Sequence, residues 1–258
     1  MRVRAWGLAW LANPAFWQGL AGIAGFFAVW ALAHRIGWLV VPGPAEVAAG
    51  LPRLVSEPTY WLSWLGSGQR VLAGFAIAAV LALALGLAMG VSRKLRLTAF
   101  PVLEFLRPIP PLAWLPLSIL FWPTSETTMT FLTFMGAFFP ILISVLAGID
   151  RVDSRYVEAA LSLGSSRRAI FRRILLPRAL PFVFTGFAIA IGITWEVVIA
   201  AEMASATNGL GYLTWNAYVN HSLPGIIIGM LSIGFAGMAS SAIVTWLGRR
   251  AMPWQRRM

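Results

Sequence analysis

The chain has 258 residues, of which 59% are hydrophobic and 11% charged, whereas an ordinary soluble domain carries roughly 25% charged residues. This composition excludes a water-soluble globular fold, because such a fold could not cover so much apolar surface. The net charge of +11 lies in short basic clusters between long apolar runs, so we expect a lipid surface and no nucleic acid as partner. With no cysteine, the chain has no disulfide, thiolate metal site or cysteine nucleophile.

Long apolar segments predict an all-α membrane protein that forms one domain over residues 1–258. A helix needs about 20 apolar residues to cross the hydrocarbon core, and we predict about six crossings. The predicted spans are 19–41, 71–91, 99–122, 127–149, 181–203 and 225–247. The span 99–122 should be distorted, because prolines remove backbone donors and prevent a straight helix. Its prolines are Pro101, Pro108, Pro110, Pro111 and Pro116.

The N-terminal region imitates a signal peptide, with a basic start, an apolar stretch and the small-residue sequence Ala31-Leu32-Ala33. Its apolar run continues to Val41, which is longer than a usual signal core, so we expect an uncleaved first span.

Most lysine and arginine residues lie at the two ends of the chain, in the short segment 93–96, and within 150–180. Cytoplasmic loops retain such residues, so both termini and the 150–180 segment should be cytoplasmic. We expect a multi-pass protein of the bacterial inner membrane.

The segment 150–180 is the longest polar stretch and still has helical apolar periodicity, which predicts two short helices joined by a tight turn. Ser, Thr and Asp favour helix starts, glycine favours the left-handed position after a helix, and proline ends helices. We expect the first helix to start at Asp153 or Ser154 and the turn to lie at Gly164. The second helix should start at Ser165 or Ser166 and should be stopped by Pro177 and Pro181.

The same segment carries a family pattern. Glu158-Ala159-Ala160, three residues, Gly164, nine residues and then Ile174-Leu175-Leu176-Pro177 resemble the EAA loop of ABC importer permeases. The resemblance implies a type I importer permease fold in which this loop docks onto a cytoplasmic ATPase. The implied coupling residues are Glu158, Ala159, Ala160, Gly164, Ser165, Ile174 and Pro177. The alternative is a basic amphipathic hairpin that lies on anionic lipid.

The resemblance also implies the other components. ATP and Mg would be bound by two partner ATPase subunits, with no cofactor in this chain. A second permease copy, in a homodimer, and an extracytoplasmic substrate-binding protein would complete the transporter. Solute transport by alternating access would be driven by the ATPases.

Two further stretches, Leu106 to Leu117 and Ala200 to Tyr212, are similar to permeases of the nitrate, sulfonate, taurine and bicarbonate group. The sequence Phe121-Trp122-Pro123-Thr124 departs from the turn that many members have there. The resemblance implies nitrate, taurine, an alkanesulfonate or a related small anion or organic solute, without choosing among them.

Charged residues within predicted spans suggest function, since each costs about 3 kcal/mol at mid-membrane on insertion scales. Glu104 and Arg107 are three residues apart and can form an ion pair near the inner face. Glu196 could have a role in the pathway or gate, or it could hydrogen-bond a neighbouring helix. Glu202 could lie at the membrane interface or stabilise a gate. The pathway or gate candidates are Arg107, Pro108, Pro110, Pro111, Trp114, Glu196 and Glu202.

Catalytic motifs are missing from the sequence. Lys94 lacks the glycine spacing of a phosphate-binding loop, and there is no nucleophile elbow or HExxH sequence, so we expect a non-catalytic subunit. An ion-coupled secondary transporter remains the main alternative, although it should show broken helices in two matched halves, and only one is evident. A membrane-embedded enzyme is the third class.

Overall fold

The computed structural model describes residues 14–38 and 41–254, which form helices and no strand. Five helices in this part of the chain are long and apolar enough to cross a membrane. They are α1 (Pro14–Arg35), α3 (Pro58–Val91), α6 (Ser125–Asp150), the helix that ends as α9 (Leu176–Ser205), and α11 (Leu223–Ala251). The all-α membrane fold expected from the sequence is confirmed.

The core of the bundle lies where α3 and α9 pack on either side of α6. Small residues permit this close approach: a side chain on Gly74 of α3 would meet Thr133 of α6, and one on Gly186 of α9 would meet Ser144. Such small-residue contacts let membrane helices pack tightly, because there is no hydrophobic driving force between helices inside a lipid bilayer.

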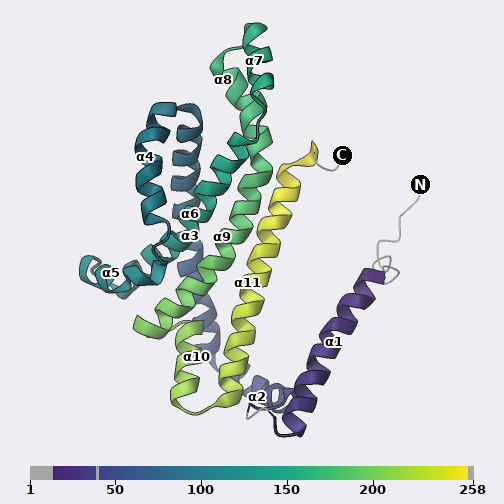
Figure 1. The fold of residues 1–258 in the computed structure, drawn as a ribbon. Helices are drawn as coiled ribbons and strands as arrows, with labels where there is room; N and C mark the ends of the chain where they lie inside the picture. The colour runs from purple at the N-terminus through teal and green to yellow at the C-terminus, as the bar shows by residue number, and fades with distance from the viewer. Residues whose placement is uncertain (1–13, 39–40, 255–258) are drawn as a thin grey trace.

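The first helix lies apart from this core (Figure 1), and none of its most apolar stretch is buried. The predicted span 19–41 is wrong at its end, because α1 ends at Arg35. Gly37 adopts a left-handed φ of 74°, and Gly37 and Trp38 donate to the last carbonyls of the helix. Residues 39–40 lie outside the described part of the chain. The short helix α2 (Pro44–Ser56) then leads to α3.

Helix α3 begins at Pro58, well before the predicted start at residue 71. The first turns of α3 contain polar residues, so the apolar run used for the prediction does not reach them. The helix start is instead defined by proline at the first helical position and by the extended backbone of Glu57. Helices α6 and α11 lie within a few residues of the predicted spans 127–149 and 225–247.

The segment 99–122 is broken, as its prolines predict. It consists of α4 (Arg93–Leu106), an irregular stretch at 107–110, the 3₁₀ turn η1 (Pro111–Trp114) and α5 (Leu115–Phe121). None of these pieces is among the five candidate spans, so a crossing by this segment stays a prediction.

After α6, the chain forms a helical hairpin of α7 (Ser154–Ser162) and α8 (Arg167–Ile170). The prediction that Pro177 and Pro181 stop the second helix is wrong. A π-helical turn, η2 (Phe171–Leu175), joins α8 to α9 in one continuous helix, with Leu176 N–H donating to Phe171 C=O. Prolines are tolerated in membrane helices because neighbouring helices and local π turns satisfy the backbone groups that a proline leaves without a hydrogen bond.

The bundle has two distinct ends (Figure 1). The α7–α8 hairpin, the end of α11 and the beginning of α4 lie at one end, which we call the hairpin end. The opposite end holds α2 and α10 (Leu210–Val219), and we call it the α10 end.

Candidate functional site

The turn of the hairpin is built as the sequence predicts. Asp153 accepts a hydrogen bond from Arg155 N–H at the start of α7, and Ser166 accepts one from Ala169 N–H at the start of α8. Gly164 has φ of 78°, with Gly164 N–H bonded to Leu161 C=O and the next N–H to Ala160 C=O. This pair of bonds is a Schellman motif, which fixes the direction of the chain after a helix.

The hairpin surface is largely free of contacts with the rest of the chain. Glu158, Ala159 and Gly164 are exposed, and Leu163 is 86% exposed. Ala160 and Ser165 are half-buried at the turn, whereas Ile174 and Pro177 lie further along, in or after the π turn. The predicted coupling residues are therefore split between the hairpin tip and its base.

The continuous helix from Arg167 to Ser205 has 39 residues, which corresponds to about 58 Å at 1.5 Å per residue. A bilayer with its headgroups is about 40–45 Å thick, so this helix is about 15 Å longer than the bilayer is thick.

A cavity of about 410 Å³ lies beside the middle of α6 and is lined by Arg107, Ile109, Pro111, Gly136, Pro140 and Ile193, among others. The guanidinium of Arg107 lies 3.3 Å from the Glu104 carboxylate, which confirms the expected ion pair. Because the cavity reaches Gly136 and Pro140, the pair lies beside the middle of α6.

The remaining pathway candidates are not gathered at this cavity. Pro108 and Pro110 are exposed and do not line it. Trp114 lines a second cavity, of about 360 Å³, next to α5, and its buried indole N–H has no hydrogen-bond partner in the described residues. Glu196 is exposed on α9, and within residues 14–38 and 41–254 nothing hydrogen-bonds to it.

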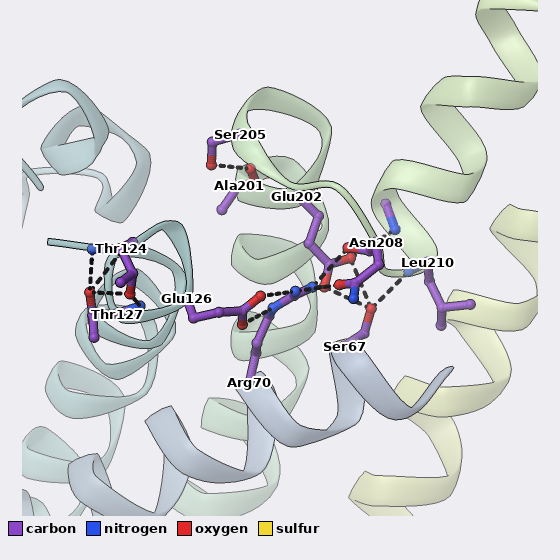
Figure 2. Close-up of polar contacts among 11 residues, drawn as sticks. Ser67, Arg70, Thr124, Glu126, Thr127, Ala201, Glu202, Ser205, Asn208 and Leu210 are labelled. Carbon is purple, nitrogen blue, oxygen red and sulfur yellow. Dashed lines mark hydrogen bonds and ion pairs between the residues drawn. The ribbon is translucent and has the colours of Figure 1, made fainter. Parts of the chain in front are cut away.

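Glu202 belongs to a buried polar network near the α10 end (Figure 2). Its carboxylate is fully buried and accepts hydrogen bonds from Ser67 Oγ at 2.8 Å, Arg70 Nη1 at 2.7 Å and Gly211 N–H at 2.9 Å. The Ser67 hydroxyl also accepts from Leu210 N–H at 2.8 Å. Glu202 therefore connects helices of the bundle and does not line the Arg107 cavity.

Arg70 is the centre of this network and is only 3% exposed. Its Nε donates to Glu126 at 2.7 Å, and Nη1 also donates to Asn208 C=O at 2.9 Å. Nη2 donates to the Glu126 carboxylate and to the Asn208 side chain (Figure 2). All five guanidinium donors are thus satisfied, and α3, α6, α9 and the start of α10 are joined at one point.

The sequence reasoning missed Ser67, Arg70, Glu126 and Asn208 as members of a site. A signal was available: in a six-crossing topology, Arg70, Glu126 and Glu202 border spans on the same side of the membrane. Charged residues at matching span ends can pair, and this criterion would have linked Arg70 to the two glutamates.

Comparison with known proteins gives the family. Residues 78–257 match the binding-protein-dependent transport system inner membrane component family. The nitrate import permease NrtB of Synechococcus elongatus is 34% identical over 96% of this chain and 95% of its own. The bicarbonate transport system permease CmpB of the same species is 33% identical over 89% of this chain and 87% of its own.

A solved structure supports the fold. A chain of the methionine ABC transporter MetNI, in an inward-facing conformation, aligns with a TM-score of 0.56 and 18% identity, over 77% of this chain and 98% of that one. The family expected from the sequence is confirmed, because the match covers most of the chain. The chain belongs to the binding-protein-dependent transport inner membrane component family and is a permease subunit of an ABC importer.

Proposed function

We infer that this permease moves a small oxyanion or a related small organic solute, of the class that includes nitrate, taurine and alkanesulfonates. Relatives with nitrate and bicarbonate import in their names support this class. The Arg107 cavity supports it further, because a guanidinium at mid-membrane depth offers charged donors to an oxyanion. Irregular backbone at 107–110 is tolerated at that depth only where it is buried or borders a cavity.

One observation supports the coupling role: the α7–α8 hairpin stands at the end of a 39-residue helix, which is about 15 Å longer than a bilayer with its headgroups is thick. An exposed apolar side chain such as Leu163 in that position favours contact with a protein over contact with lipid headgroups. The hairpin is thus a docking element for a separate ATPase. ATP and Mg are bound by that ATPase, and this chain is a non-catalytic subunit without a cofactor.

The assembly follows from this role. Two copies of the chain and two ATPase subunits form the transporter, and a binding protein delivers the solute from outside. Arg93, Arg96, Arg151 and the hairpin arginines gather toward the hairpin end, so that end is cytoplasmic. The beginning of α1 and the end of α11 lie toward the same end (Figure 1), which supports a cytoplasmic position for both termini of this inner-membrane protein.

Copurification with the ATPase tests the proposal. Gly164→Val forces a β-branched residue into the left-handed conformation, although there is open space around the position. We expect this variant and Glu158→Lys to lose the ATPase while remaining folded in the membrane. Gly234→Val is the matched control, because Gly234 also has open space but an ordinary helical φ.

The control should retain the ATPase as the wild type does. If Gly164→Val and Glu158→Lys both retain a stoichiometric ATPase, the hairpin is not the docking element and the coupling role is wrong.

A further inference from the structure

Glu196 lies deep within a span and has no partner among the described residues. It is nine residues before Ser205, so it is about 14 Å from the α10 end of the helix along the axis. The carboxylate is exposed, and no described residue donates a hydrogen bond or pairs with it. An ionisable side chain at this depth faces water or protein and not lipid. In the assembled transporter, Glu196 therefore faces either a water-filled pathway or another subunit.

That surface extends along one face of α9. Thr185, Ile189 and Glu196 are exposed. Gly192, which lies between Ile189 and Glu196, and Ala200, which follows Glu196 by one turn, are half-buried. These positions recur every three or four residues, so they share one side of the helix. A side chain on Gly192 would meet nothing within 4 Å, so no described residue packs against the face at this position.

The Glu196 face lies next to the Arg107 cavity, with Ile193 between them. Ile193, which is one turn from Glu196, forms part of the cavity wall. Arg107 uses one nitrogen for Glu104, at 3.3 Å, and its side chain is 45% exposed. A guanidinium has five donors, so Arg107 retains donors for an anionic group of a solute.

We propose that Glu196 binds the cationic group of the solute, so that the solute is a small zwitterion with an oxyacid anion and an ammonium group. This rests on the proposed function and makes its solute class narrower. In an amino sulfonate, the sulfonate would face Arg107 and the ammonium Glu196. A simple oxyanion has no group for Glu196, and repulsion between the two negative charges is strong where little water screens it.

Thiol labelling of the full chain in complex with its ATPase, in lipid nanodiscs, tests this directly. The chain has no cysteine, so Ala200→Cys introduces a single thiol one turn from Glu196. An uncharged, water-soluble maleimide should label it, and 2-aminoethanesulfonate should slow the labelling. At about ten times its Kd, the solute should slow it about tenfold, because only the empty fraction reacts. Ethanesulfonate, which lacks the ammonium, should give little protection.

Two controls complete the design. Glu196→Gln in the Ala200→Cys chain should abolish protection by 2-aminoethanesulfonate without abolishing labelling. Val80→Cys, which is an exposed apolar position on α3, should not react with the maleimide.

Three results overturn the proposal: no labelling of Ala200→Cys, equal protection by ethanesulfonate or nitrate, or protection that survives Glu196→Gln. The bound ATPase in the same preparation reports separately on the importer assignment. If the ATPase is retained and any of these results is obtained, the zwitterionic solute is rejected while the importer assignment stands.

Discussion

Helix α9 carries two glutamates six residues apart, and their surroundings are opposite. Glu202 is fully buried and accepts hydrogen bonds from Ser67, Arg70 and Gly211. Glu196 is exposed and receives none from the described residues. Sequence position separates the two only by depth, because Glu196 lies deep in the span and Glu202 lies near its outer end.

The difference separates two uses of a charge inside a membrane. A buried carboxylate whose acceptor sites are filled by its own chain is part of the fold, because removing one partner leaves an uncompensated charge. A carboxylate that its own chain leaves unfilled is available to a solute, to water or to another subunit. Three variants test this division, from the largest expected effect on stability to the smallest.

Arg70→Met should have the largest effect. It leaves Glu202 buried without its counter-ion, and breaking a buried pair costs about 3–5 kcal/mol. We expect a large fall in the thermal unfolding midpoint of the purified chain and a low yield of monodisperse protein. Arg53→Met removes an exposed arginine near the same end and should change stability by no more than about 0.5 kcal/mol. An Arg70→Met chain as stable as the wild type would mean that the network does not hold the fold together.

Gly209→Ala should have an intermediate effect. Gly209 has φ of 122° and ψ of 166°, a conformation that is essentially restricted to glycine, and a residue held there costs about 1–3 kcal/mol. Its side chain would also fall on the Glu202 carboxyl group. The thermal midpoint should therefore drop. Gly192→Ala, in α9 with open space and helical φ, should leave it unchanged or slightly raised. Equal midpoints for the two variants would contradict the strain at Gly209.

Glu196→Leu should have the smallest effect on stability and a clear effect on transport. Glu196 is exposed and has no hydrogen-bond partner among the described residues, so the thermal midpoint should change little. Solute uptake into proteoliposomes that contain the complete transporter should fall, because the solute loses a contact. A drop in stability as large as that of Arg70→Met would show that Glu196 is also a structural residue.

Much of the fold could be predicted from local signals. The spans with clear apolar runs, the proline break near Arg107, and the Asp153, Gly164 and Ser166 positions of the hairpin all follow from properties of neighbouring residues. The continuous helix through Pro177 could not be predicted, because proline usually ends a helix and the π turn that accommodates it has no known sequence signal.

The Arg70 network escaped prediction for a different reason. Arg70, Glu126 and Glu202 lie far apart in the sequence, and their contact depends on how α3, α6 and α9 pack. The sequence also separates Glu202 from Glu196 by depth in the span, but it does not tell which of them is buried. Burial decides which glutamate is structural, and burial follows from tertiary structure.

The uninterrupted helix from Arg167 to Ser205 has a mechanical consequence. Its outer end is held by Arg70 at Glu202, its middle packs against α6, and its other end carries the hairpin. A movement of the hairpin is therefore transmitted along a single helix into the core of the bundle. The π turn at Phe171–Leu175 is what joins the hairpin to this helix without a break.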